Sequence, residues 1–247
     1  MNFRILTYNI HRAIGMDRLF RPERIARILA HYDADIILLQ EVDVGVPRSR
    51  KLNLAKEMAE QLGYPFYAVG LNVQLRTGMY GNATISRYPI VKERNIDLTI
   101  EGRKARGCLY TLLAIPLKSG RKQKLAVFNL HLGISFKERP RQIGRLVHAP
   151  EFRQLDSNAL CLVAGDFNDW QKRLAPMFTE ILDFNCATNY QGGYQNAFLT
   201  FPSFSPTGGL DKIFCRGNIR IERSRCCRMR ASRIASDHLP VIADLII

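Results

Sequence analysis

Apolar residues in this chain fall into short runs that alternate with segments of helical spacing. The runs that we predict to be strands are FRILTYNI (3–10), ADIILLQEV (34–42), GNATISRYPIV (81–91), GCLYTLLAIPL (107–117), KLAVFNLHLG (124–133), ALCLVAGDFN (159–168), LDKIFC (210–215) and PVIADLII (240–247). The predicted helices are RPERIARILAHY (21–32), NLAKEMAEQLG (53–63), RLAPMFTEIL (173–182) and part of 135–152, which we expect Pro140 and Pro150 to break. Continuous apolar runs of this kind are typical of buried strands.

The alternation of these elements predicts an α/β protein. The runs at 107–117 and 124–133 are joined through KSGRK (118–122), which is typical of a hairpin turn, so we expect mixed rather than purely parallel sheets. No Pro/Gly/Ser-rich linker divides the chain. We therefore predict one domain over residues 1–247.

Polar residues follow or interrupt the ends of six of these runs. They are Asn9, Glu41, His131, Asp166, Asn168, Asp211, Asp237 and His238. One such residue is routine, but this many predict that the strand ends converge on a single cleft.

The adjacent pair Asp237 and His238 precedes the last apolar run. Neighbouring side chains on a strand point to opposite faces, so both can act on one substrate only if they lie on the loop that enters the strand. The alternative is a polar turn capped by Asp237, with Pro240 opening the strand. If the pair is catalytic, a further buried acid such as Asp211 could orient the imidazole.

Carboxylate and amide oxygens are the ligands that Mg²⁺ and Mn²⁺ prefer, and Glu41 lies where a buried run ends. Five histidines and no clustered cysteines argue against zinc. The chain has no GxSxG, Walker or GxGxxG motif. These observations favour metal-assisted attack of water on phosphorus, with Asp166 as a candidate base.

The formal net charge of +14 favours anionic partners such as nucleic acid, phosphorylated metabolites or acidic lipid surfaces. Arginines concentrate in 136–145 and 219–233, although either run could simply be a solvated face. Six cysteines without metal-ligand spacing are expected as reduced thiols. With no apolar stretch of 18 residues and no signal peptide at the N-terminus, we expect a cytoplasmic monomer without a transmembrane segment.

Seven short motifs occur in a characteristic order: TYNIH, LLQEVD, GNATISRYPI, NLHLG, GDFND, LDKIF and SDHLPV. From residue 5 to residue 245, the chain resembles the endonuclease/exonuclease/phosphatase superfamily of DNase I-like hydrolases. The resemblance implies a four-layer α/β sandwich, in which two mixed sheets pack face to face with helices outside, and a divalent metal at one edge of the sheets.

The resemblance also implies roles for individual residues. Glu41 would be the principal metal ligand, with Asn9 assisting and Asp237 approaching the metal. Asp166 would activate the attacking water, and Asp211 would orient His238 toward a phosphoryl oxygen. The remaining phosphate contacts would be His131, Asn168 and Arg106.

Residues 9–26 depart from members that cleave abasic DNA, because His11 stands where those enzymes carry an acid or amide. The chain looks more like a bacterial branch of metal-dependent hydrolases. His11 is either a phosphate contact or a structural residue, and Trp170 is expected to pack rather than to stack on substrate.

The leading hypothesis is a Mg²⁺- or Mn²⁺-dependent phosphodiesterase acting on nucleic acid. The alternatives are a phospholipid-headgroup phosphodiesterase, a soluble phosphomonoesterase, or a basic binding module without catalysis. Specificity is expected in the loops at 43–52, 72–80 and 187–209.

Overall fold

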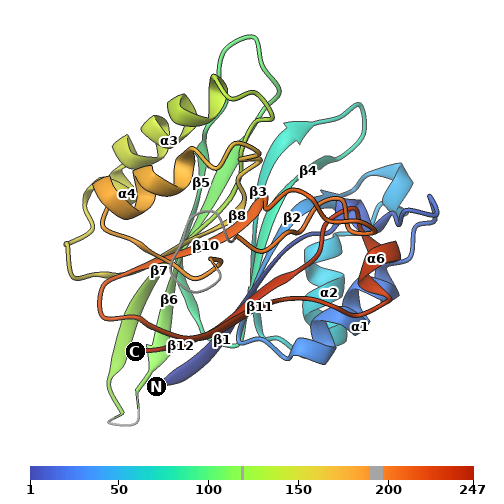
Figure 1. The fold of residues 1–247 in the computed structure, drawn as a ribbon. Coiled ribbons are helices and arrows are strands. Elements are labelled where there is room, and N and C mark those ends of the chain that lie inside the picture. The colour runs from blue at the N-terminus through green and yellow to red at the C-terminus, as the bar shows by residue number, and fades with distance from the viewer. Residues whose placement is uncertain (118–119, 190–196) are drawn as a thin grey trace.

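Two six-stranded sheets pack face to face in the computed structural model, which describes residues 1–117, 120–189 and 197–247 (Figure 1). The first sheet has the spatial order β11 (Arg220–Cys226), β12 (Val241–Ile246), β1 (Asn2–Asn9), β2 (Ile36–Val44), β4 (Met79–Ser86) and β3 (Phe66–Gln74). The second has the order β5 (Ile90–Asp97), β6 (Gly107–Pro116), β7 (Lys122–His131), β8 (Leu160–Asp166), β10 (Asp211–Arg216) and β9 (Asn185–Cys186). Both sheets are mixed, because β1 runs parallel to β2 and β7 runs parallel to β8.

Helices cover the outer faces of both sheets, which completes the predicted four layers. The elements outside the sheets are η1 (His11–Ala13), α1 (Pro22–Tyr32), η2 (Pro47–Ser49), α2 (Leu54–Leu62), α3 (Glu138–His148), α4 (Pro150–Arg153), α5 (Leu174–Pro176), η3 (Met177–Ile181) and α6 (Ser232–Ala235). α1 and α2 pack on the first sheet, and α3, α4 and η3 pack on the second. The fold class predicted from the sequence is confirmed.

Successive side chains on a strand point to opposite faces of the sheet, so each strand contributes to two layers of the hydrophobic core. On β1, Ile5 points into the layer between the sheets, whereas Leu6 packs beneath the helices. β2 repeats this with Leu38 inward and Leu39 outward. Burial of both faces accounts for the nearly continuous apolar runs in the sequence.

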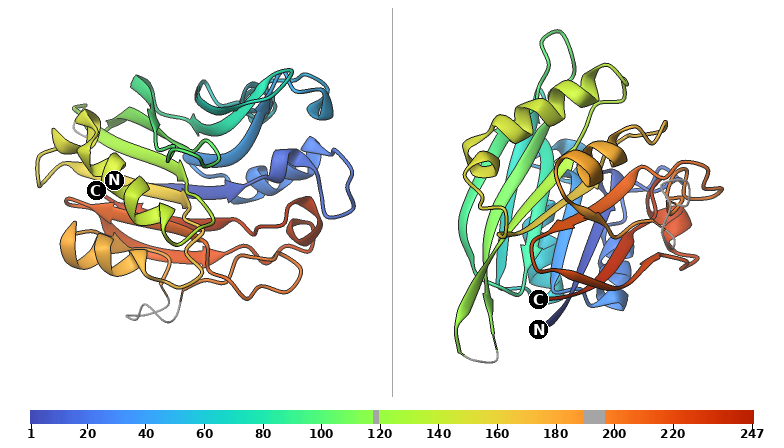
Figure 2. Two further views of the ribbon diagram at one scale, coloured as in Figure 1. Left: turned by 90° about the horizontal axis from the view of Figure 1, so that it is seen from above. Right: turned by 60° about the vertical axis from the view of Figure 1, so that its left-hand side comes forward.

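β1 and β12 pair antiparallel, with Asn2 opposite Ile246, so the two ends of the chain lie side by side (Figure 2). The pair lies inside the first sheet, because β2 and β11 flank it. The hairpin between β6 and β7 is confirmed by their pairing through Pro116 and Lys122, although residues 118–119 of its predicted turn lie outside the described residues.

Several element predictions need correction. The run at 81–91 is divided between β4 and β5, and β3 and β11 were not predicted. Pro140 does not break α3, because it lies in the first turn, where its missing N–H costs no helical hydrogen bond. The helix predicted at 173–182 consists of α5 and η3. No helix among the described residues is long and apolar enough to span a membrane.

Candidate active site

The layer between the sheets changes from apolar to polar toward one end. Gln40 follows the inward-facing Leu38 on β2, and its amide donates to Thr7 Oγ1 (3.1 Å) and Asn129 Oδ1 (2.7 Å). Asn129 in turn donates to the backbone oxygens of Leu39 and Ala83. These buried groups form a hydrogen-bonded polar floor, in which Gln40 Oε1 is left without a donor among the described residues.

Beyond this floor, strand register gathers three of the predicted site residues. Asp166, the last residue of β8, is opposite His131 on β7 and Asp211 on β10. Asn9, at the end of β1 in the other sheet, donates from Nδ2 to Asp166 Oδ2 (3.1 Å). Asp166 is therefore the point at which the two sheets meet at the polar end.

Gly165 makes this strand end possible. Its φ is +137°, and an added Cβ would lie 2.0 Å from the carbonyl oxygen of Leu130 on the neighbouring strand β7. Only glycine fits such a close approach at positive φ. The glycine that precedes the acid in GDFND is thus required by the geometry of β8.

Asp237 and His238 lie on the loop before β12, and this loop turns His238 toward the cleft. His238 Nδ1 lies 2.8 Å from Asp211 Oδ2, and its Nε2 lies 3.7 Å from Asp166 Oδ2. The Ser236 hydroxyl fixes the loop, because it donates to the Asn9 carbonyl and accepts from the His238 N–H. It also lies 3.3 Å from Asp237 Oδ1.

Burial and neighbouring charges separate the pKa values of these groups. Burial lowers the pKa of His238, but the carboxylates of Asp211 and Asp166 outweigh it and raise that pKa to about 10. Burial also raises the pKa of Asp166 to about 6, since the nearby His238 opposes this only in part. At neutral pH the cleft therefore holds an imidazolium beside a carboxylate of raised basicity.

His131 behaves in the opposite way. Its Nε2 lies 3.4 Å from Asp166 Oδ2, yet burial, with the positive charges of Arg106 and His238, lowers its pKa well below the ordinary value. His131 is therefore a neutral hydrogen-bonding group near pH 7. Arg106 is buried nearby, and its Nε has no hydrogen-bond partner among the described residues, so it is available to an anion.

Glu41 lies at a distortion of β2. The pairing of β2 with β4 shifts register between Leu39 and Val42, and Glu41 has φ +56°, which is uncommon for a residue with a Cβ. Without this bulge the alternation of the strand would turn Glu41 away from the inward-facing Gln40. Such local strain is often stored at functional sites.

Arg12 was missed in the sequence, and it contacts Glu41. Its Nε lies 3.3 Å from Glu41 Oε2. The only signal available was its position in NIHR, directly after the first strand. Three successive residues, His11 to Ala13, have positive φ and fold this segment back over the strand end.

The structure gives His11 a local contact. Its ring Nδ1 lies 2.9 Å from the Ile14 carbonyl, and its backbone N–H donates to Asn9 Oδ1. These contacts favour the structural role over a phosphate contact. Asn168, which also has positive φ (+49°), donates from its N–H to Asp166 Oδ1 and from its amide to the Leu132 carbonyl.

Trp170 packs in part, as predicted, but remains 47% exposed. Its ring meets Phe201 edge-to-face at 5.4 Å and lies over Gly208, where an added Cβ would be 2.9 Å away. Phe201 in turn contacts the His238 ring at 4.9 Å.

The cleft fits a divalent cation. One buried carboxylate oxygen, Asp211 Oδ1, lacks a hydrogen-bond donor among the described residues, and the only partner of Glu41 Oε2 there is the ion pair with Arg12 at 3.3 Å. Burial of an unpaired carboxylate oxygen is costly unless a cation compensates it. In addition, the carboxylates of Asp166 and Asp211 lie within 4.8 Å of each other, beside the His238 ring. Oxygen donors of this kind suit Mg²⁺ or Mn²⁺.

The fold and this cleft define an α/β protein in which two mixed sheets pack face to face, with an acidic and histidine-containing centre at one end of the layer between them. The model of the Endonuclease/Exonuclease/phosphatase family matches residues 6–238, and the chain belongs to that family. Enzymes of this family hydrolyse phosphoesters and generally depend on a divalent metal.

Individual proteins resemble the chain over nearly its whole length. YbhP of Escherichia coli (strain K12) is 29% identical over 99% of this chain and 96% of its own. An endonuclease/exonuclease/phosphatase from Beutenbergia cavernae superposes with a TM-score of 0.79 at 21% identity, covering 100% of this chain and 72% of that one. Two further structures share the fold. The mannosyl-6-phosphatase Bt3783 of Bacteroides thetaiotaomicron has a TM-score of 0.71 at 21% identity, covering 99% of this chain and 100% of its own. D. rerio TDP2 complexed with single-strand DNA product has a TM-score of 0.73 at 17% identity, covering 100% and 99%.

Proposed function

We propose that the chain is a divalent-metal-dependent phosphodiesterase that hydrolyses its substrate by direct attack of water. The observation that carries this proposal is the position of Asp166. Its carboxylate, with a pKa raised to about 6, lies between the His238 imidazolium and the neutral His131. A carboxylate of this basicity suits the removal of a proton from water near neutral pH.

The other side chains have complementary roles in this proposal. His238, held by Asp211, supplies a cationic N–H to a phosphoryl oxygen, where negative charge develops in the transition state. Arg106, His131 and Asn168 hold the remaining phosphoryl oxygens. The backbone contacts of Asn168 and the bond from Asn9 to Asp166 fix the base in position.

Glu41 would be the principal metal ligand, with Asn9 and Asp237 assisting. A bound Mg²⁺ or Mn²⁺ would polarise the phosphoryl oxygen and assist the leaving oxygen. We favour Glu41 as the metal ligand over the group of Asp166, Asp211 and His238. In that group, Asp211 and His238 are hydrogen-bonded to each other, and the protonated imidazole of His238 offers no lone pair to a metal. Arg12 would hold the Glu41 carboxylate in place.

The test measures turnover of a bis-aryl phosphodiester and an aryl phosphomonoester, with and without chelator. We expect metal-dependent turnover that favours the diester. Glu41→Gln should lower it by about a thousandfold while leaving the circular dichroism spectrum unchanged. Calorimetric titration with Mn²⁺ should show weaker metal binding by Glu41→Gln than by Asp211→Asn.

Preference for the monoester would point to a phosphatase instead. Absence of turnover for both substrates would favour the non-catalytic binding module. Metal-dependent turnover retained by Glu41→Gln would contradict the assignment of this ligand.

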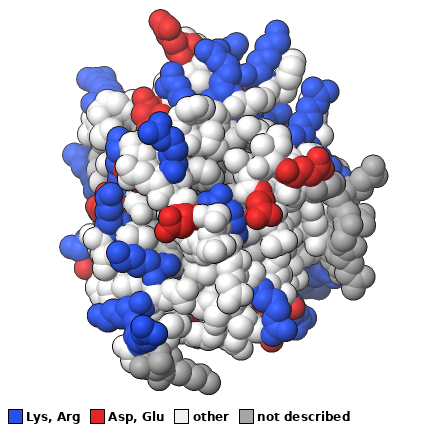
Figure 3. Space-filling model, turned by 90° about the vertical axis from the view of Figure 1, so that its left-hand side faces the viewer, with Lys and Arg blue, Asp and Glu red and all other residues white. Residues whose placement is uncertain are grey.

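Two substrate classes fit a basic enzyme of this kind. The net charge of +14 favours nucleic acid, which stays a prediction. Arg139, from the first arginine run, is buried and donates to the Ile134 carbonyl, so it does not add to a nucleic-acid surface. Lysines and arginines are scattered over the face shown in Figure 3 rather than aligned in one track. The apolar side chains on another side of the molecule favour a phospholipid as the second candidate.

A further inference from the structure

Exposed apolar side chains gather beside the loop that carries His238. Four of them, which we call the apolar rim, are Met16, Leu19, Phe204 and Ile234, each between 42% and 60% exposed. Single exposed apolar residues are normal, whereas a contiguous group marks an interaction site.

Hydrogen bonds to the backbone hold the chain segments that carry the rim side by side. The Met16 N–H donates to the Ile234 carbonyl at 2.8 Å, so the segment 14–20 lies against α6, as Figure 1 also shows. Next to Phe204, Ser203 donates from its hydroxyl to the Arg233 and Ser236 carbonyls and from its N–H to the Asp237 carbonyl. The rim therefore adjoins the loop 236–238 directly.

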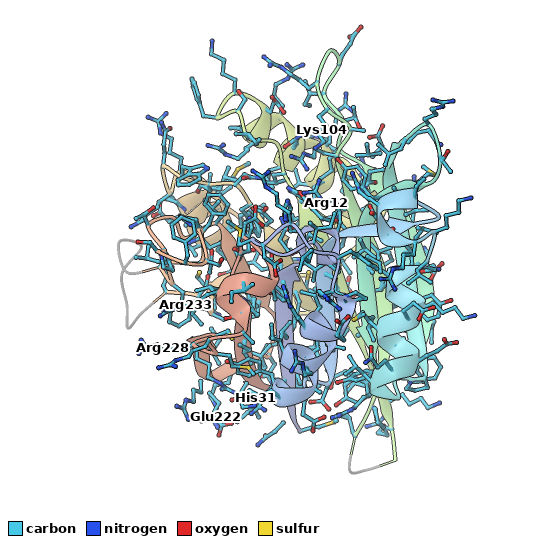
Figure 4. The ribbon with its side chains drawn as sticks, turned by 90° about the vertical axis from the view of Figure 1, so that its right-hand side faces the viewer. Arg12, His31, Lys104, Glu222, Arg228 and Arg233 are labelled. Atoms are coloured by element: carbon cyan, nitrogen blue, oxygen red, sulfur yellow. The ribbon has the colours of Figure 1, made fainter. Side chains whose placement is uncertain are left out.

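Positive charge surrounds the rim. Four exposed arginines of these segments have no carboxylate within ion-pair distance in the described part of the chain: Arg18, Arg228, Arg230 and Arg233. The neighbouring acids are mostly compensated, because Asp17 pairs with Arg24 and Glu23 pairs with Arg21. Figure 4 shows Arg228 and Arg233 on the same side of the molecule as Arg12, which contacts the proposed metal ligand.

A pocket of ≈ 480 Å³ lies beside the rim and combines an apolar lining with positive charge. Leu199, Leu239 and Phe198 give it an apolar lining, and Arg228 and Arg233 line it as well. Leu239 directly follows His238, so the pocket adjoins the catalytic loop from the other side. An apolar lining next to unpaired arginines complements an anionic amphiphile.

We propose that the apolar rim and its arginines dock onto the surface of an anionic phospholipid bilayer. Met, Leu and Ile side chains gain by entering the boundary between headgroups and acyl chains, while arginines attract anionic headgroups. Nucleic acid explains the rim less well, because sequence-tolerant binding of bases uses flat aromatic faces, and three of the four rim residues are aliphatic. Docking would bring the cleft against headgroup phosphodiesters, a consequence that rests on the proposed function.

The experiment measures co-sedimentation of the full chain with vesicles in the presence of chelator, so that binding is separated from hydrolysis. Vesicles of phosphatidylcholine alone are compared with vesicles of equal parts phosphatidylcholine and phosphatidylglycerol. We expect binding to the anionic vesicles that weakens with salt. Met16→Asp/Leu19→Asp/Ile234→Asp should weaken it by about tenfold or more. Arg228→Gln/Arg230→Gln/Arg233→Gln should weaken it similarly.

The matched control is Val91→Asp/Ile181→Asp, which changes two exposed apolar residues of the other sheet and its helical layer. It should bind vesicles as the parent does. All three variants should hydrolyse the soluble aryl diester at the parent rate, which verifies folding.

Absence of vesicle binding by the parent overturns the proposal. It is also overturned if the apolar variant binds vesicles normally, or if the arginine variant binds vesicles normally but loses binding to an oligonucleotide measured in parallel, which would indicate a nucleic-acid surface. Vesicle binding by a chain that hydrolyses no phosphodiester would uphold the docking surface and refute the proposed function. Turnover of the soluble aryl diester without vesicle binding would uphold the proposed function and refute the docking surface.

Discussion

Asp166 links more of the cleft than any other single side chain described above. One of its oxygens accepts from Asn9 and lies near both histidines, while the other accepts from the backbone of Asn168. The two histidines differ because His238 has a second carboxylate, Asp211, and His131 instead has Arg106 beside it. Two imidazoles in one cleft are therefore set to opposite protonation states by their neighbours.

This arrangement predicts a bell-shaped pH dependence of kcat/KM for the aryl diester. Activity should fall in acid as Asp166 is protonated near pH 6, and in alkali as His238 loses its proton near pH 10. Asp211→Asn removes the charge and the hydrogen bond that raise the pKa of His238. Its alkaline limb should therefore move to lower pH, which a pH–rate profile measures directly. An unmoved alkaline limb would show that another group controls it.

Asp211 and His238 should also act as one unit. His238→Ala and Asp211→Asn should each lower kcat by about a hundredfold or more, because the first removes the imidazolium and the second removes the carboxylate that orients it and keeps it charged. The double variant should be scarcely worse than the more damaging single one. Fully additive losses in this double-mutant cycle would mean that Asp211 contributes independently of His238.

Among the elements, sequence pattern predicted the strands whose two faces are both buried and missed those at the sheet margins. β11 is an edge strand whose residues are exposed or half-buried, so its sequence lacks the apolar run that marks the inner strands. The strand ends of β1, β7 and β8 were predictable because an apolar run stops there at a polar residue. The contact of Arg12 with Glu41 was not predictable from the sequence. It depends on three residues of positive φ and on a bulge, and sequence periodicity encodes neither of these features.

Glycine-to-alanine substitution should have opposite effects at two positions, because only one of them lies where β8 closely approaches β7. Gly165→Ala should destabilise the protein by about 2–4 kcal/mol, since its Cβ would overlap the Leu130 carbonyl at a positive φ. Gly144→Ala on α3, where an added Cβ meets nothing within 4 Å, should stabilise it by about 0.5–1 kcal/mol. Urea unfolding of both variants checks this pair. Equal effects at the two sites would contradict the steric argument.

For the molecule as a whole, the shared layer between the sheets predicts cooperative unfolding. Strands of both sheets contribute to this one core, so neither sheet can lose its partner without exposing the apolar face of the other. We expect a single transition in which the calorimetric and van't Hoff enthalpies agree. Two resolved transitions would contradict the prediction of one domain over residues 1–247.

The pairing of β1 with β12 has a consequence for synthesis on the ribosome. β1 emerges first, yet its antiparallel partner and the loop carrying His238 follow more than two hundred residues later, as the pairing of Asn2 with Ile246 shows. Until then the nascent chain exposes an unpaired edge of apolar strand, which is a target for chaperones and for aggregation. The same delay keeps the cleft incomplete until His238 has been synthesised, so a growing chain lacks the proposed active site.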